Sequence, residues 1–207
     1  MIASEEAARD YCGQFLDARG LDRLDRLATM LSAENRQQNL VAEATLAAVW
    51  QRHFADSLQL LQHAPAGEGI WLDLGTGAGF PGLPIALAQP NRTVVLVESR
   101  KRRAEWLTTA AKIMGLVNVE IFGTRLERTN TIAAEVISAR AFAPLDRLLP
   151  LAVRFSSADT TWLLPKGRSA VQELAEQNVA VQRMFHVEHS LTDAEAGILV
   201  GRGVPAT

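Results

Sequence analysis

The sequence has little cysteine and lacks the long apolar runs and leader pattern of membrane or secreted proteins. Cys12 is the only cysteine in 207 residues, which excludes an internal disulfide and a cysteine-based metal cluster. No apolar run approaches the length of a membrane span. The first residues do not show the basic-then-apolar pattern of a secretory signal. We therefore expect a cytoplasmic protein without membrane contact, and we expect no metal site.

The sequence also lacks a strong net charge. The formal charge is −2 at pH 7, so composition gives no global support for nucleic-acid binding. Any RNA partner would have to be held by a local basic patch. Hydrophobic residues make up 48% and charged residues 21% of the chain, which is typical of a globular protein. The length predicts one domain with an extension.

Turn-forming residues at positions 65–69 divide the chain into a helical and an α/β part. We expect an N-terminal helical extension over 1–66 and a second domain over 67–207. Within the extension, the pattern predicts a helix from Ser4 to Gly20 and a second helix carrying leucines between 21 and 31. Residues 35–39 read as a connector, and a third helix is predicted from about 45 to 61.

Short apolar runs alternate with helical patterns after residue 69. The predicted strands are 70–74, 93–98, 117–122, 136–141 and 160–164, followed by two late strands at 179–189 and 197–200. Repeated β-α alternation predicts a doubly wound α/β fold with a mainly parallel sheet. The two late strands predict an antiparallel hairpin at its C-terminal edge.

A glycine-rich turn between the first two predicted strands is the strongest functional signal. Asp73 lies near the end of the first strand, and Gly75, Gly77 and Gly79 follow it. Glycines allow a sharp turn and let a ligand approach the backbone closely. Glu98 ends the second strand at the carboxyl edge of the sheet, where open α/β folds bind ligands. A carboxylate there can accept both hydroxyl protons of a ribose, so the unit predicts a site for a nucleoside-like cofactor.

Two cofactors fit the spacing of this turn. Residues 77–82 match the G-x-G-x-x-G dinucleotide fingerprint, whereas residues 73–77 match the D-x-G-x-G arrangement of S-adenosylmethionine (SAM) methyltransferases. The strand ends at Leu74, so the dinucleotide register begins two residues late. Asp73 suits a cationic methionyl group and would repel a pyrophosphate. We therefore expect SAM.

Basic residues follow three predicted strands at the same edge. Positions 100–103 are Arg, Lys, Arg and Arg, and Arg125 and Lys166 lie on neighbouring loops. Taken alone, the basic run at 100–103 is most simply interpreted as the solvent-exposed face of a helix. Because three loops place cations at the same edge of the sheet, we favour instead a surface that contacts RNA phosphates.

Two further features involve polar residues with less obvious roles. Arg140 is predicted to end a buried strand, where it can clamp a carboxylate or a phosphate, or form a structural ion pair. His53, Asp56 and Ser57 share one face of the third predicted helix. No third metal ligand accompanies them, and one helix face does not align them as a catalytic triad. A buried, satisfied polar network is the favoured interpretation.

Missing motifs narrow the chemistry of methyl transfer. The fourth strand is not followed by Asn-Pro-Pro-Tyr or Asp-Pro-Pro-Tyr, which is typical of exocyclic-amine methylation. No cysteine lies near the sheet edge for covalent attack on a pyrimidine. Ring-nitrogen, oxygen and small-molecule acceptors remain. Guanine N7 fits because it carries an exposed lone pair and needs positioning rather than a general base.

Five segments together resemble the RsmG (GidB) family of bacterial 16S rRNA guanine-N7 methyltransferases. They occur in the order Asn-Leu-Val at 39–41, Arg-His-Phe-Ala-Asp-Ser-Leu at 52–58, the turn at 72–82, Ser-Ala-Arg-Ala-Phe-Ala at 138–143 and Leu-Pro-Lys-Gly at 164–167. The resemblance covers about residues 20 to 200. It implies a class I, Rossmann-like SAM-dependent methyltransferase fold, and a guanine in the 530 loop of the small-subunit rRNA as substrate.

The resemblance implies SAM contacts for Gly75, Phe80, Leu126, Glu127 and Arg140, and a role in activity or RNA contact for Arg102, Arg125 and Lys166. The glycine turn and the basic run supply the other candidates. Arg140 and Lys166 are the candidate catalytic residues, and Arg102, Arg103, Arg125 and Lys166 are the candidate RNA contacts. The candidate cofactor contacts are Asp73, Gly75, Gly77, Gly79, Phe80, Glu98, Leu126, Glu127 and Arg140. We expect a monomer that acts on 16S rRNA or the small ribosomal subunit. A small-molecule SAM methyltransferase and a non-catalytic SAM or nucleotide sensor remain as alternatives.

Overall fold

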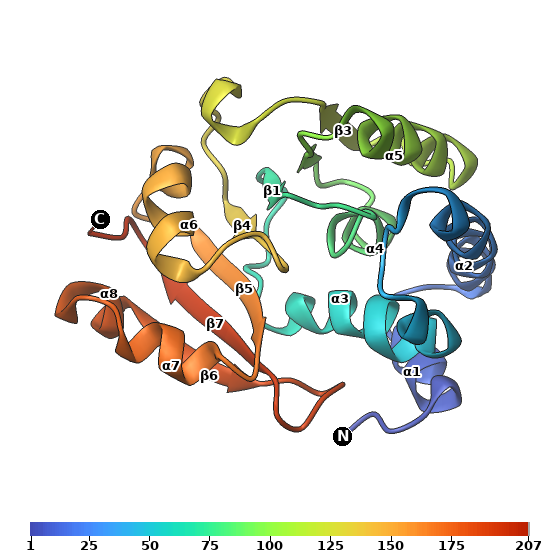
Figure 1. The fold of residues 1–207 in the computed structure, drawn as a ribbon, viewed down its shortest axis with the longest axis horizontal. Helices are drawn as coiled ribbons and strands as arrows, with labels where there is room; N and C mark the ends of the chain where they lie inside the picture. Colours follow the sequence, from blue (N-terminus) through green and yellow to red (C-terminus); the bar gives the residue numbers. More distant parts are fainter. Residues whose placement is uncertain (207) are drawn as a thin grey trace.

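A seven-stranded sheet organises the protein, whose computed structural model describes residues 1–206 (Figure 1). The strand order is β3-β2-β1-β4-β5-β7-β6. The first five strands in the chain pair in parallel, and β7 and β6 add an antiparallel hairpin at the edge. The predicted doubly wound sheet and its C-terminal antiparallel edge are thus confirmed. The strands are β1 (Trp71–Leu74), β2 (Val94–Val97), β3 (Val119–Phe122), β4 (Val136–Ser138), β5 (Thr161–Gly167), β6 (Phe185–His189) and β7 (Gly197–Arg202).

Helices cover both faces of this sheet. The first group, over the N-terminal residues, consists of α1 (Glu5–Cys12), α2 (Ala18–Gln38), a 3-10 segment (Glu43–Ala48), a π-helical segment (Trp50–Ala55), α3 (Asp56–Leu58) and a second 3-10 segment (Gln59–Gln62). The others are α4 (Gly82–Ala88), α5 (Lys101–Ile113), a 3-10 turn (Leu126–Arg128), α6 (Leu145–Ala152), a 3-10 turn (Val153–Phe155), α7 (Ala170–Ala175) and α8 (Val179–Met184). No helix among residues 1–206 is both long and apolar enough to cross a membrane.

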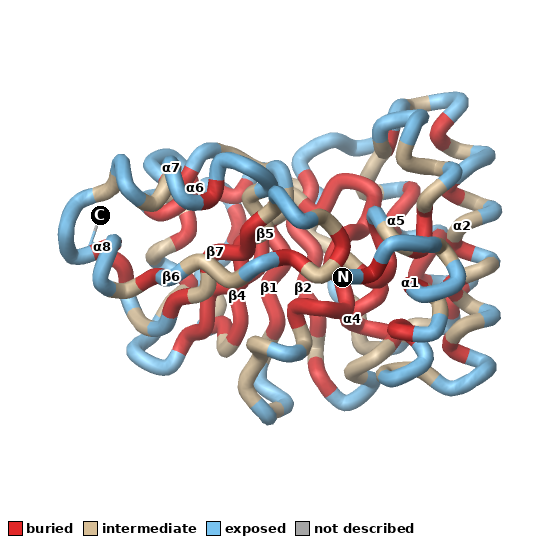
Figure 2. Tube along the Cα trace, turned by 90° about the horizontal axis from the view of Figure 1, so that it is seen from below, coloured by how far each residue is buried: buried red, intermediate tan, exposed pale blue. Residues whose placement is uncertain are grey.

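Alternate residues of the strands enter two separate hydrophobic cores. Trp71 packs with the core that α1 to α5 cover, whereas its neighbour Leu72 packs on the opposite face, under α6 and α8. This alternation is the period of two that a strand imposes. Figure 2 shows the central strands buried and the outer helices exposed on their solvent side. The first core joins residues before and after position 66, so the predicted division at 66/67 does not separate two cores.

The N-terminal helices differ from their predicted boundaries. The first helix ends at Cys12, and Gly20 lies in the first turn of α2, where Asp17 caps its amide at 2.8 Å. The expected connector at 35–39 is wrong, because α2 continues to Gln38 and ends on Asn39 with φ 44°. Asn35 is buried in that helix, and hydrogen bonds to Glu43 and the Val41 amide satisfy it. Tertiary partners thus compensate a residue that local patterns assign to a loop.

Three other boundaries also differ. The helix expected over 45–61 is a chain of short segments of different pitch. Residues 179–184 are helical rather than extended, because the Asn178 side chain caps the Val181 amide. The fourth strand ends at Ser138 instead of 141, and Ala141 adopts φ 53°. Arg140 therefore lies in the loop beyond the strand.

Candidate functional site

Two cavities open at the carboxyl edge of the sheet, where the strand order reverses between β1 and β4. Ligands bind at this position in open α/β folds. The smaller cavity measures about 380 Å³ and the larger about 760 Å³. Both are lined by Ala141 and Phe142 in the loop after β4. The two cavities therefore adjoin along this loop.

The glycine turn forms the floor of the smaller cavity at Gly75. This glycine has φ 63°, and a Cβ at this position would collide with the ring of Phe142. The turn also needs Asp73, whose carboxylate is fully buried and accepts hydrogen bonds from the Gly82 amide (3.0 Å) and the Ser138 hydroxyl (2.8 Å). Burial raises the pKa of Asp73 to about 6, although these hydrogen bonds lower it. Asp73 thus stabilises the glycine turn through these hydrogen bonds and does not line the smaller cavity.

Glu98, which follows the neighbouring strand β2, also lines the smaller cavity. It is buried, and its Oε1 accepts a hydrogen bond from the Arg100 amide at 2.7 Å. Among residues 1–206, its second carboxylate oxygen has no hydrogen-bond donor. A glycine and a free carboxylate oxygen in one cavity are the features that a nucleoside group requires. Leu126, Glu127, Arg103 and Arg125 complete the lining, together with Val97, Ser99, Arg100 and Thr124.

The predicted basic residues divide into two groups. Arg102 and Arg125 are exposed, as are Arg100 and Lys101. Arg103 is partly buried: it lines the smaller cavity, its Nη1 lies beside the turn at Gly77, and its Nη2 donates to the Asn39 carbonyl at 3.3 Å. Four of these cations are thus exposed, and Arg100, Arg103 and Arg125 also line the smaller cavity.

Lys166 occupies the larger cavity and is 8% exposed. Its Nζ donates to the Ala143 carbonyl (2.7 Å) and lies 2.9 Å from the Glu173 carboxylate. Glu173 also accepts from the Leu145 amide and the Ser169 hydroxyl. Burial raises the pKa of Glu173, but the hydrogen bonds from Ser169 and Lys166 lower it by more. The pKa of Glu173 therefore lies below its usual value. Lys166 is thus paired rather than a free cation.

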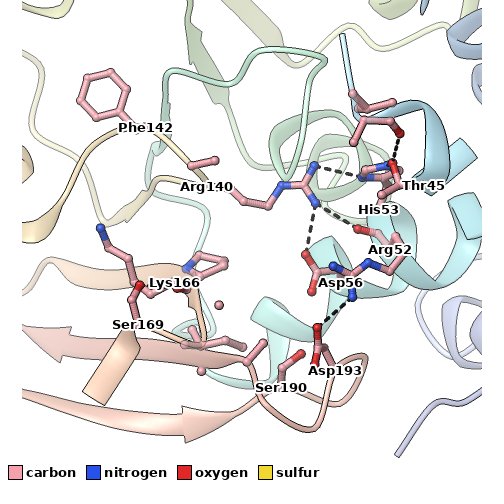
Figure 3. A pocket seen from close by; sticks show the side chains of 18 of the residues that line it. Thr45, Arg52, His53, Asp56, Arg140, Phe142, Lys166, Ser169, Ser190 and Asp193 are labelled. Atoms are coloured by element: carbon pink, nitrogen blue, oxygen red, sulfur yellow. Dashed lines mark hydrogen bonds and ion pairs between the residues drawn. The ribbon is translucent and has the colours of Figure 1, made fainter. Parts of the chain in front are cut away.

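Arg140 faces the same cavity from the other side, where it meets the N-terminal helices (Figure 3). Its Nη1 lies 3.2 Å from the Asp56 carboxylate and donates to the Arg52 carbonyl at 3.1 Å. Its Nη2 lies 3.1 Å from Nδ1 of His53. The ion pair that the sequence left open is therefore present. Phe80, which is buried, lies under the guanidinium at 5.2 Å and lines neither cavity.

The predicted polar network around His53 is also present. His53 is 5% and Ser57 1% exposed, and the Ser57 hydroxyl donates to the His53 carbonyl. Burial, Arg140 and Arg52 lower the pKa of His53 to about 3. The imidazole is therefore neutral at pH 7. No cluster of three potential metal ligands occurs among residues 1–206.

Several residues of the site carried no signal in the sequence. Phe142 stands between the two cavities, and Glu173, Thr45 and Asp193 line the larger one. Phe142 occurs in the Ser-Ala-Arg-Ala-Phe-Ala run, which gave only a resemblance and no role. Glu173 lies in α7 and Asp193 in the β6–β7 loop, outside the five segments that carry the resemblance, so only the tertiary arrangement identifies them.

Comparisons with known proteins identify related sequences over almost the whole chain. The sequence model described as "GidB: rRNA small subunit methyltransferase G" matches residues 21–197. A ribosomal RNA small subunit methyltransferase G of Erythrobacter litoralis is 55% identical, covering 98% of both chains. The enzyme of the same name from Novosphingobium aromaticivorans is 53% identical and covers 97% of this chain and 89% of its own length.

Solved structures share the fold at low sequence identity. A SAM-dependent methyltransferase from Aquifex aeolicus has a TM-score of 0.60 at 13% identity, covering 84% of this chain and 98% of that one. A precorrin-6y C5,15-methyltransferase from Geobacter metallireducens gives 0.55 at 10% identity, with coverage of 72% and 87%. The expected class I methyltransferase fold is thereby confirmed.

Proposed function

Because the chain belongs to the rRNA small subunit methyltransferase G family, we propose that it transfers the methyl group of SAM to N7 of a guanine in the 530 loop of 16S rRNA. The family resemblance supports the reaction and the substrate. The observation that carries the proposal structurally is the pair of adjoining cavities at the carboxyl edge of the sheet. One suits a nucleoside cofactor and the other leaves room for an acceptor base.

The smaller cavity suits SAM, which supplies an electrophilic methyl group on a sulfonium. Gly75 lets the cofactor approach the backbone, and the free oxygen of Glu98 accepts from a ribose hydroxyl. Leu126 and Glu127 line the end where the adenine would lie. Gly77, Gly79 and Phe80 shape the turn, and buried Asp73 fixes it through the Gly82 amide. The cavity volume lies in the range of small-molecule sites.

Arg140 binds the carboxylate of the methionyl group in this proposal. A guanidinium has five N–H groups, of which three contact Arg52, Asp56 and His53. The two remaining N–H groups have no partner among residues 1–206. They are available to a carboxylate in the larger cavity, and the loop carrying Ala141 and Phe142 connects that point with the smaller cavity.

The larger cavity takes the guanine, and the exposed cations hold the surrounding RNA. Guanine N7 has a lone pair in the plane of the base, so no residue has to remove a proton before methyl transfer. Arg102 and Arg125 contribute phosphate contacts, with Arg100 and Lys101 beside them. Lys166 acts within the cavity, where its third N–H is available to an acceptor base. The protein acts as a cytoplasmic monomer on the small ribosomal subunit.

The test is methylation of 16S rRNA by the purified protein. Naked 16S rRNA and intact small subunits, both from a strain that lacks this gene, are incubated with SAM, digested and analysed by mass spectrometry. We expect one 7-methylguanosine, which primer extension places in the 530 loop, and we expect Gly75→Asp to produce none. S-adenosylhomocysteine formed without methylated rRNA would favour a small-molecule acceptor. Cofactor binding without any turnover would favour a sensor.

A further inference from the structure

We infer that His53 is a positioning residue, which holds Arg140 in place so that the N-terminal helices set the cofactor affinity of the site. The inference rests on the proposed function in one respect, namely that Arg140 contacts the cofactor. It concerns a residue that does not line the smaller cavity and that contacts the glycine turn only through the ring of Phe80. The structural basis is a chain of hydrogen bonds that runs from residues 42–53 to Arg140.

The hydrogen bonds have a single consistent direction. Arg140 has no acceptor, so Nη2 must donate to Nδ1 of His53, at 3.1 Å. The imidazole is then protonated on Nε2, which donates to the Thr45 hydroxyl at 2.8 Å. Thr45 in turn donates to the Ala42 carbonyl at 2.6 Å. Each group thus fixes the next, and the last acceptor is a backbone carbonyl. Figure 3 shows the contacts of His53 with Arg140 and Thr45.

Only a neutral His53 can act in this way. A protonated imidazole would present an N–H to the guanidinium and place two positive charges 3.1 Å apart. Burial and the nearby Arg140 and Arg52 lower the pKa of His53 to about 3, so the acceptor is available at neutral pH. The environment that buries the ring therefore also maintains the contact that orients Arg140.

Other contacts restrain the same two side chains. The His53 ring stacks on Phe80 with 4.9 Å between centroids and 13° between planes. Asp56 binds Arg140 through Oδ2, while its Oδ1 accepts from Thr192 at 2.8 Å and Gln59 at 2.9 Å. Arg140 is therefore held by three groups from residues 52–56, namely the Arg52 carbonyl and the His53 and Asp56 side chains. Fixing a side chain beforehand reduces the entropy lost when it binds a ligand.

A double-mutant cycle tests the inference by isothermal titration of SAM. His53→Phe keeps an aromatic ring on Phe80 but removes the acceptor for Arg140. We expect the Kd for SAM to rise roughly tenfold in this variant, and to change less than about twofold when His53→Phe is added to Arg140→Ala. His53→Asn places an amide oxygen near the position of Nδ1, and its Kd should stay within about threefold of the wild-type value.

A milder variant keeps the test valid if His53→Phe does not fold. Thr45→Val removes the acceptor of the His53 Nε2–H at a partly exposed position, and it should raise the Kd about two- to threefold. Thermal melting of each variant separates affinity from stability. An unchanged Kd in folded His53→Phe would overturn the inference, and so would an equal loss of affinity with and without the Arg140→Ala substitution.

The cycle is independent of the methylation assay. The double-mutant cycle measures the Kd for SAM, so it gives a result whether or not rRNA is the methyl acceptor. If rRNA stays unmethylated while the cycle shows coupling, the proposed substrate fails and the inference stands. If Arg140→Ala binds SAM as tightly as the wild type, both the inference and the proposed role of Arg140 fail.

Discussion

The two cavities are built in different ways, although they share the loop at 141–142. The smaller cavity is formed by residues 75–142, and its main features, the glycine turn and Glu98, come from one β-α-β unit. The larger cavity combines residues from 40–56, 140–144, 165–173 and 190–198. The proposed cofactor cavity is therefore formed mainly by one local unit, to which Arg140 adds a contact from the larger cavity. The proposed acceptor site depends instead on the packing of the N-terminal helices and the β6–β7 loop against the sheet.

The largest effect is expected from a substitution in the smaller cavity, which should weaken SAM binding. Gly75→Ala introduces a Cβ at φ 63° and against the Phe142 ring, and left-handed backbone costs a non-glycine residue about 1–2 kcal/mol before any displacement of that ring. We expect the Kd for SAM to rise more than about tenfold by titration calorimetry. Gly123→Ala is the matched control, because its Cβ would meet Ala104 at an ordinary 3.4 Å. Equal cofactor affinity in both variants would contradict this assignment.

The next prediction concerns the larger cavity. Lys166→Met keeps the side-chain volume but leaves the Glu173 carboxylate, which is 20% exposed, without its cation. We expect a loss of about 1–3 kcal/mol in the free energy of unfolding, because a partly buried charge is left unpaired. Denaturant unfolding measures the loss, and SAM affinity should stay unchanged. Adding Glu173→Gln should restore part of the stability; a double variant as unstable as the sum of the two single variants would argue against the pair.

The third prediction concerns the pH dependence of the stability of the fold, to which His53 in the N-terminal helices contributes. The pKa of His53 is about 3 in the folded protein and about 6.5 when unfolded. The unfolded state therefore binds the proton first, and stability falls by about 1.4 kcal/mol per pH unit as pH drops below about 6. Arg140 and Arg52, which face the ring, stay charged throughout. Urea unfolding of wild type and His53→Asn from pH 7 to 4 should show a steeper decline in the wild type, and parallel curves would refute it.

The smallest expected effect concerns the exposed cations at the cavity edge. Arg102→Glu should raise the KM for small subunits a few-fold and reduce the slope of log K against log salt by about one to two units, since each phosphate contact contributes about 0.7–0.9. Lys112→Glu is the control, because it is exposed on the same helix α5 but at its other end. Equal effects of the two substitutions would indicate a general charge effect rather than a local RNA contact.

The sequence predicted the sheet well because its strands are short apolar runs bounded by turn residues. Asp73, Gly75 and Glu98 were placed at one edge by strand ends alone, and the structure brings Gly75 and Glu98 to one cavity. The family resemblance is confirmed by the matching relatives. The roles of the individual site residues and the domain boundary remain predictions.

Other features could not be predicted, because they depend on side-chain contacts that form only in the folded protein. The helix around Asn35 persists because Glu43 and Val41 satisfy its side chain. The sequence predicts Lys166 as a free cation, but it pairs with Glu173, 7 residues further along the chain. Arg140 pairs with Asp56, which lies 84 residues before it. No local pattern records such partners.

By itself the sequence determined the succession of the five parallel strands, the glycine turn and the cations that follow it. These depend on backbone geometry and on the alternation of apolar residues, which act over a few neighbouring positions. Only the tertiary structure decided which charges are paired, which His53 tautomer is present and where the second cavity lies. Those properties depend on burial and on hydrogen-bond partners, which exist only once distant segments have packed together.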